Sequence, residues 1–211
     1  MNPDHLRRYT DLAAAIRMLK TRSITLLSPS SWDDKNDKNL MAAYQRHIQH
    51  KTVLALCFAE AAETYHHWKV FCPGKDGICI VFEKARLISA LPKAELQHSL
   101  VRYYTLKKLR EHEPTPERVP FSKRAAYRDE KEFRLLFSCA DQELKSKDFE
   151  FPVAAIGRVI VNPWLADPLV DTVREVINTI PGFETLDVLQ SRVTDGPAWK
   201  AFAQRIAGNV K

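Results

Sequence analysis

The fold class follows from two apolar runs, TVLALCF at residues 52–58 and GICIVF at residues 77–82. Each run is short and almost wholly apolar, which predicts a strand that is covered on both faces. A Pro73-Gly74 turn signal precedes the second run. The two runs therefore predict the interior of a β-sheet.

Further strands and helices are predicted on both sides of these runs. The additional strands are expected at residues 23–27, 100–105, 132–138, 149–153, 157–161 and 186–193. Helices are expected at residues 11–20 with Asp11 as the N-cap, and at 40–50, 123–129 and 167–179. Because strands and helices do not alternate regularly, we expect an α+β fold in one domain over residues 1–211, with a mixed or mainly antiparallel sheet and flanking helices.

The composition is that of a globular chain without a membrane span. Of the 211 residues, 45% are hydrophobic and 27% are charged, which suits one sizeable core. No apolar run approaches the roughly 18 residues that a membrane helix needs, and the start of the chain is polar. A cytoplasmic location is therefore expected. Cys57 and Cys79 lie in the apolar runs, and we expect both to be buried and unpaired.

The charge distribution is compatible with a polyanionic partner. The formal net charge is +6, and the stretch from Arg102 to Arg134 holds ten basic and six acidic residues. Such an excess favours association with nucleic acid or a nucleotide. A solvated basic face is the alternative interpretation.

A polar loop follows the strand predicted at residues 23–27. It contains Ser28 and three carboxylates, Asp33, Asp34 and Asp37. Carboxylates at this spacing could contribute to a divalent-cation site, although the glycine and the closing glutamate of an EF-hand loop are missing. A turn that leads into a helix N-cap is the alternative, and we assign no metal ligand here.

An aromatic and histidine cluster occupies residues 65–68. On a helix, His66 and His67 point about 100° apart, so they cannot chelate one metal ion. Tyr65 and Trp68 share a face at this spacing. The cluster is interpreted either as aromatic packing or as a ligand-binding surface formed by Tyr65, His67 and Trp68, on which a base or a nicotinamide ring would stack.

A third cluster lies at residues 127–134 and contains the Glu-x-Glu pair of Glu130 and Glu132. If a strand begins at Glu132, then Glu132 and Arg134 share one face. The alternatives are a functional site, in which Glu132 and Glu130 are catalytic and Arg134 binds the ligand, and a charged edge strand. Glu132→Gln is expected to abolish activity, because it removes the catalytic charge. The fold should stay intact, because a surface ion pair contributes at most about 1 kcal/mol to stability.

The order of these motifs resembles a bacterial family of unknown function, domain family twenty-nine seventy-one. The motifs that carry the resemblance are Arg8-Tyr9, Leu27-Ser28-Pro29, the loop at 32–37, Leu56-Cys57-Phe58, the clusters at 65–68 and 129–134, and the run at 77–82. Many relatives have an Asn-Asp-Pro step in the acidic loop, whereas this chain has Lys38 in place of the proline. The resemblance implies a divergent bacterial member with one fold, and it implies no activity.

The leading functional hypothesis is an enzyme similar to the ADP-ribosyltransferases, which use NAD. These enzymes have an early Arg or His that holds NAD, then a Ser, Thr or Tyr, and a late Glu that is often part of Glu-x-Glu. Arg8, Ser28 and Glu132 occur here in that order, with Glu130 two residues earlier. The late carboxylate would stabilise an oxocarbenium-like transition state. This hypothesis predicts that Tyr65, Trp68 and Glu132 lie around one concave site.

Two other functions stay open on the sequence. A metal-dependent nuclease would use Asp33, Asp34 or Asp37 together with Glu130 and Lys131. A binding module without catalysis would use the aromatic and basic residues to contact nucleic acid or a nucleotide. The three hypotheses differ in which of these side chains share a pocket.

Overall fold

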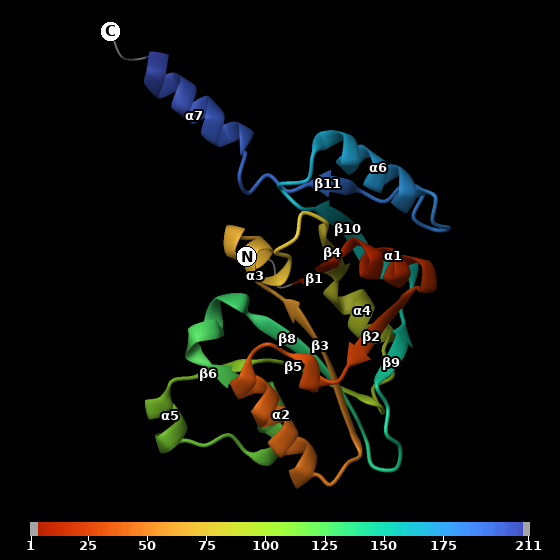
Figure 1. Cartoon of the computed structure of the whole chain (residues 1–211), viewed down its shortest axis with the longest axis vertical. Coiled ribbons are helices and arrows are strands. Elements are labelled where there is room, and N and C mark those ends of the chain that lie inside the picture. The colour runs from red at the N-terminus through yellow and green to blue at the C-terminus, as the bar shows by residue number, and fades with distance from the viewer. Residues whose placement is uncertain (1–3, 209–211) are drawn as a thin grey trace. The chain divides into compact units, whose positions relative to one another are not determined.

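The computed structural model describes residues 4–208, which form two compact units (Figure 1). Within that range, the first unit comprises residues 4–8, 21–62 and 82–155, and the second comprises residues 9–20, 63–81 and 156–208. Strands β1 (His5–Asp11) and β4 (Gly77–Glu83) contribute residues to both units. The predicted α+β class, with a mixed and mainly antiparallel sheet flanked by helices, is confirmed. The prediction of one domain stays a prediction.

The sheet of the first unit is organised around β3 (Thr52–Ala59), the strand predicted from the first apolar run. It pairs along its whole length with antiparallel β8 (Glu132–Cys139), and it also pairs with β1 and with β2 (Ser23–Leu27). Strand β9 (Ser146–Glu150) extends the sheet beyond β2, and β5 (Leu96–Leu100) pairs with the other edge of β8. Strand β8 is therefore an interior strand.

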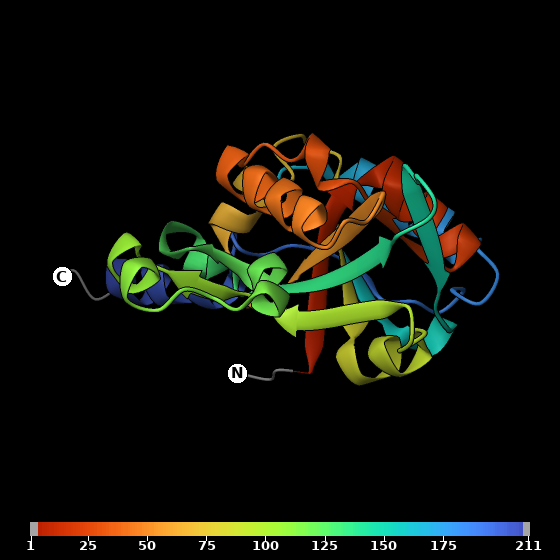
Figure 2. The same cartoon turned by 90° about the horizontal axis from the view of Figure 1, so that it is seen from below.

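Helices flank these strands on both sides. Helix α2 (Lys35–His47) places Met41 and Tyr44 against a core that includes Leu136 of β8. Figure 2 shows α2, in orange, on one side of β5 and β8 and α4 (Lys84–Ala90), in yellow-green, on the other. The burial of these apolar side chains fixes α2 above the face of β8 that carries Leu136.

A small second sheet lies in the segment that precedes β8. Strands β6 (Arg102–Tyr104) and β7 (Ser122–Arg124) pair in parallel, and a 3₁₀ helix follows at Ala125–Glu130. The predicted helix at residues 123–129 is therefore wrong. Lys131 ends the 3₁₀ turn in the left-handed region, with a φ of 42°, and the chain then enters β8.

The second unit contains residues 77–81 of the other apolar run, in β4, next to β10 (Ile156–Val161). Strand β11 (Val188–Gln190) pairs in parallel with β10, and α6 (Asp167–Asn178) lies against β11. Gly77 begins β4 at a close approach, because a Cβ there would lie 2.5 Å from the Cβ of Cys72. The helices α1 (Leu12–Thr21), α3 (Tyr65–Phe71) and α7 (Pro197–Gly208) also belong to this unit, apart from the last residue of α1.

Several predicted boundaries differ from those of the structure. The helix expected at 40–50 begins at Lys35, because the Asp34 carboxylate caps it by accepting from the backbone N–H of Asn36. The strand expected at 100–105 is divided between β5 and β6, and the strands expected at 149–153 and 186–193 correspond to β9 and the shorter β11. Short elements complete the chain: 3₁₀ helices at Pro29–Ser31, Pro116–Phe121 and Val153–Ala155, and α5 (Leu106–Glu111). Among residues 4–208, no helix combines the length and apolar character that a membrane span requires.

Candidate functional site

Strand β8 carries charged side chains into the interior of the first unit. Residues that face each other across an antiparallel pair share one face of the sheet, and Glu132 lies opposite Ala59 while Arg134 lies opposite Cys57. Arg134 is 0% exposed and Glu132 is 3% exposed. The interpretation of this segment as a charged edge strand is therefore wrong, because β8 has partners on both edges and α2 above it.

The buried guanidinium of Arg134 is paired on several sides. Its Nε donates to Oε1 of Glu132 at 2.7 Å, and its Nη2 donates to Oδ2 of Asp37 at 2.7 Å. Its Nη1 donates to the carbonyl oxygen of Pro120 at 2.7 Å and to Oδ1 of Asp37 at 3.2 Å. The ring of Trp32 lies 4.7 Å from the guanidinium carbon. The two-point pairing with Asp37 fixes the plane of the guanidinium.

Lys123 joins the same carboxylates from β7. Its Nζ donates to Oε2 of Glu130 at 2.7 Å and to Oε2 of Glu132 at 3.1 Å, and it lies 3.9 Å from Oδ2 of Asp37. We call Asp37, Lys123, Glu130, Glu132 and Arg134 the ion network. The structure thus brings Glu130, Glu132 and Arg134, which the sequence analysis singled out, together with Lys123, which it did not.

Local structure explains how α2 supplies its member of the network. The buried positions of this helix are Asp37, Met41 and Tyr44, which have the 4-and-3 spacing of one helix face. Asp37 is thus the first residue of the stripe that packs on β8. The sequence contains this spacing, but the predicted helix begins at residue 40 and therefore leaves out Asp37.

The ion network contains three carboxylates and two cations, so one negative charge is in surplus when all are ionised. Burial raises the pKa of Glu132, but the charges of Arg134 and Lys123 and the hydrogen bond from Arg134 outweigh burial and lower that pKa to about 2. Glu132 therefore stays ionised at all ordinary pH values.

The other two carboxylates respond in the opposite direction. Burial raises the pKa of Glu130 above its usual value, and the charge of Lys123 only partly offsets this effect. Burial likewise raises the pKa of Asp37 in spite of Arg134. The environment thus separates Glu130 and Glu132, two residues apart in the chain, into a carboxyl group that protonates readily and one that does not.

Two neutral groups complete the surroundings of Glu132. The backbone N–H of Glu132 donates to the hydroxyl oxygen of Tyr103 at 2.8 Å. Burial, followed by the charge of Glu132, raises the pKa of the Cys57 thiol, which hydrogen-bonds to the Glu132 carboxylate. Cys79 is buried as predicted, whereas Cys57 is only partly buried, and neither forms a disulfide.

The two remaining candidates of the first unit have different settings. The Nη1 of Arg8 donates to the carbonyl oxygen of Cys57 at 3.1 Å, and the charges of Arg8 and Glu132 both act on the Cys57 thiol. Arg8 therefore lies near the network. The hydroxyl oxygen of Ser28 accepts from the backbone N–H of Ser30 and caps the 3₁₀ turn at Pro29–Ser31. A role for Ser28 in ligand binding stays a prediction.

The aromatic candidates belong to the second unit. Trp68 is fully buried, donates from Nε1 to Oε1 of Glu63 at 2.6 Å, and meets the ring of Tyr9 edge-on. His67 is also buried and stacks on Phe71. These contacts favour aromatic packing for both residues. Tyr65 is 46% exposed, and the prediction that it lines one concave site with Trp68 and Glu132 stays a prediction.

An apolar hollow of about 100 Å³ adjoins the ion network at Asp37 and Lys123. Leu40 of α2 and Leu106 and Leu109 of α5 form its walls. The leucines of α5 are exposed at the mouth. Of the ion network, the hollow thus borders Asp37 and Lys123.

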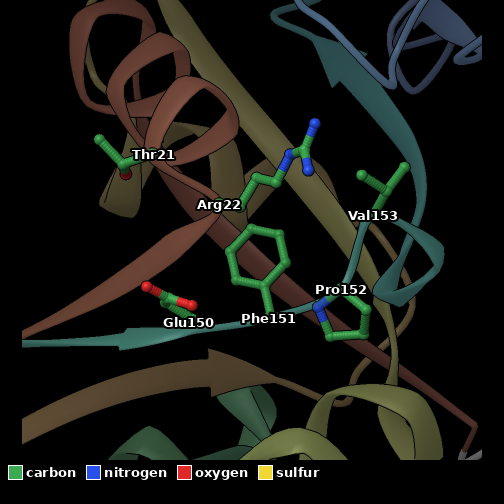
Figure 3. A pocket seen from close by; sticks show the side chains of 6 residues that line it. All are labelled: Thr21, Arg22, Glu150, Phe151, Pro152 and Val153. Atoms are coloured by element: carbon green, nitrogen blue, oxygen red, sulfur yellow. The ribbon is translucent and has the colours of Figure 1, made fainter.

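A second hollow, of about 500 Å³, lies between the end of α1 and the end of β9 (Figure 3). The side chains of Arg22 and Glu150 point to opposite ends of it, with the ring of Phe151 between them. Arg22 has a φ of 49°, the left-handed conformation that commonly follows a helix. Because its charged groups do not converge, this hollow is a weaker candidate for catalysis than the ion network.

The carboxylates of the acidic loop do not form a metal site with the Glu-x-Glu pair. Among residues 4–208, no group of three His, Cys, Asp or Glu side chains is arranged to hold a metal ion. Asp34 is used as the cap of α2, and Asp37 is paired with Arg134. Asp37 and Glu130 do converge, but on the ammonium of Lys123.

Comparisons with known proteins give a fold likeness and no family. No family model and no curated protein matches this chain. Solved structures of DarT from Thermus sp. 2.9 are similar to it. The complex with ADP-ribosylated ssDNA is 11% identical in sequence, the match covers 90% of this chain and 95% of the other, and the TM-score is 0.47. The complex with NAD+ is 13% identical, the match covers 91% of this chain and 97% of the other, and the TM-score is 0.45. The resemblance to the domain family stays a prediction.

The ion network predicts unequal effects of its two glutamates on stability. Glu132→Gln should lower the free energy of unfolding at pH 7 by about 3–5 kcal/mol, because Arg134 and Lys123 lose a buried counter-charge. Glu130→Gln leaves Glu132 and Asp37 to balance the two cations and should lower the free energy of unfolding by less than Glu132→Gln does. Urea unfolding at equilibrium measures both values. The earlier expectation that Glu132→Gln leaves the fold undisturbed rested on a surface ion pair, and that premise is wrong.

The pH dependence gives the matching control. The folded pKa of Glu132 lies below its ordinary value of 4.5, so its stabilisation is present above about pH 4.5 and is lost as the pH falls toward 2. The deficit of Glu132→Gln relative to wild type should shrink over that range. Equal losses in the two variants at pH 7 would contradict the described pairing.

Proposed function

We propose that this protein transfers ADP-ribose from NAD to an acceptor nucleophile. One observation supports the proposal: Glu130 and Glu132 flank a single ammonium, and their environments shift their pKa values in opposite directions. Pairs of carboxyl groups separated in this way serve as an acid–base group and an electrostatic group in glycosidic bond chemistry.

Glu132 is the electrostatic group in this proposal. The bond between C1′ of the ribose and the nicotinamide nitrogen breaks, and its electron pair leaves with neutral nicotinamide. Positive charge develops on the ribose as the bond breaks, and a carboxylate that stays ionised stabilises this charge. Because the leaving group departs neutral, no proton has to be donated to it.

Glu130 is the general base. A bond forms between the acceptor oxygen or nitrogen and C1′, and the proton of the acceptor passes to the Glu130 carboxylate. Its side chain is 16% exposed, compared with 4% for Glu132, so an acceptor reaches it more readily. A raised pKa brings a carboxylate closer to the basicity that proton transfer near neutral pH requires.

In this proposal, substrate replaces one hydrogen bond of the ion network, the bond from Lys123 to Glu132. Lys123 covers one oxygen of Glu132, so a ribose hydroxyl would replace its ammonium there and leave the shorter bond to Glu130 in place. The apolar hollow borders this ammonium, since Lys123 is one of its lining residues. Arg8 donates to the carbonyl oxygen of Cys57, whose thiol hydrogen-bonds to Glu132, and is the residue we assign to the diphosphate of NAD.

The proposal predicts a specific loss on Glu130→Gln. Wild-type protein should release nicotinamide from NAD, and the variant should lower kcat by about 10²–10⁴-fold, the usual contribution of a general base. The rate of wild type should fall as the pH drops through the raised pKa of Glu130, because the base acts in its ionised form. This acid limb should be absent from the variant. Chromatography of nicotinamide measures each rate.

Asp129→Asn is the matched control, since Asp129 is an exposed carboxylate in the neighbouring position. It should retain the wild-type rate and pH profile. An unchanged rate in Glu130→Gln would remove Glu130 from the reaction. Failure of wild type both to bind and to cleave NAD would overturn the proposed function.

A second candidate function, binding of single-stranded nucleic acid, has support in the second unit. The exposed ring of Tyr65 meets Trp164 edge-on at 5.4 Å, and the ammonium of Lys69 lies 3.9 Å from the centre of the Trp164 ring. Aromatic rings beside a cation are the elements that hold stacked bases and phosphates. Trp164 was missed because it stands alone in its stretch of sequence.

This candidate predicts a stacking contribution from Tyr65. Tyr65→Ala should weaken binding of a fluorescent single-stranded DNA oligonucleotide by about 1–3 kcal/mol in fluorescence anisotropy. Trp199→Ala, which removes an exposed aromatic ring of α7 outside the cluster, is the control and should leave affinity unchanged. Equal affinities for wild type and Tyr65→Ala would exclude this surface.

A further inference from the structure

Lys123 is enclosed by protein groups of the first unit. Its side chain is only 10% exposed, and its ammonium lies 4.7 Å from the ring centre of Tyr127. It lies 2.7 Å from Glu130 and 3.1 Å from Glu132. A lysine whose charge is this deeply placed is uncommon unless it is paired.

The two cations of the ion network share Glu132 and Asp37 and differ in their other partners. The guanidinium of Arg134 donates hydrogen bonds to Asp37, Glu132 and the Pro120 carbonyl group. Within residues 4–208, the ion pairing of Glu130 comes from Lys123. Lys123 is therefore the cation that Glu130 and Glu132 share.

We infer that Lys123 is a positioning residue, which holds the two carboxylates of the Glu-x-Glu pair against one buried ammonium. The inference rests on the proposed function for its kinetic readout, but its structural readout needs no turnover. Short 3₁₀ and αL turns connect Glu130 to Glu132, so their backbone alone does not oblige both carboxylates to point to one place. Both carboxylates contact the Lys123 ammonium, which fixes where they point.

The groups that face the pair decide what removal of this charge would do. Asp37 lies on the α2 side, Glu132 and Arg134 on β8, Tyr103 on β6, and Lys123 itself on β7. The charges of Glu132 and Asp37 raise the pKa of Glu130, and the charge and hydrogen bond of Lys123 lower it. Without Lys123, Glu130 would face negative charge with no cation of its own.

The test compares Lys123→Met with the conservative variant Lys123→Arg. The side-chain carboxyl carbons of ¹³C-labelled glutamate are followed by NMR over a pH titration, in protein without NAD. Lys123→Met should raise the pKa of Glu130 by about 1–3 units, the usual effect of one adjacent opposite charge. Lys123→Arg should return it close to the wild-type value. The acid limb of the pH–rate profile should move by the same amount.

Arg124→Met is the matched control, since Arg124 is the neighbouring exposed cation and has no ion pair with these carboxylates in the described part of the chain. It should leave the Glu130 titration unchanged. Lys123→Gln keeps hydrogen-bond donors at this position and replaces Lys123→Met if the latter does not fold. An unmoved Glu130 titration in the neutral variant would overturn the inference. A shifted titration in a protein that does not cleave NAD would overturn the proposed function alone.

Discussion

The pairing of the Arg134 guanidinium inside the first unit is the constraint on which the rest of the site depends. A fully buried charge is tolerated only when it is hydrogen-bonded and compensated. Asp37, Glu132 and the Pro120 carbonyl group meet this requirement, and each comes from a different element. The position of α2, the course of the chain before β7 and the start of β8 are thereby fixed around one side chain.

The two cations of the ion network do not neutralise all three carboxylates. This surplus of negative charge leaves Glu130 and Glu132 with different pKa values. Glu132 receives hydrogen bonds from both cations and stays ionised, whereas Glu130 receives one and has a raised pKa. The surplus carboxylate, Glu130, is the more exposed of the two.

The sequence predicts the parts of the fold that depend on local pattern. The strands at 52–58 and 77–82 and the helix at 167–179 are confirmed, because continuous apolar runs and 3.6-residue periodicity report burial directly. The burial of Arg134 is not readable in this way, since a charged residue in alternation suggests an edge strand. Its environment depends on the pairing of β8 with β3 and β5, which are distant in the chain. Lys123 was missed for the same reason, and a helix was predicted where β7 and a 3₁₀ turn stand.

The most direct test of the central claim is an NMR titration of wild-type protein in which the carboxyl carbons of Glu130 and Glu132 are assigned. The account predicts two separate midpoints: Glu132 near pH 2, and Glu130 above the ordinary glutamate value of 4.5. Two carboxyl groups that titrate together near 4.5 would contradict it, because they would be neither buried nor held by Arg134 and Lys123 as described.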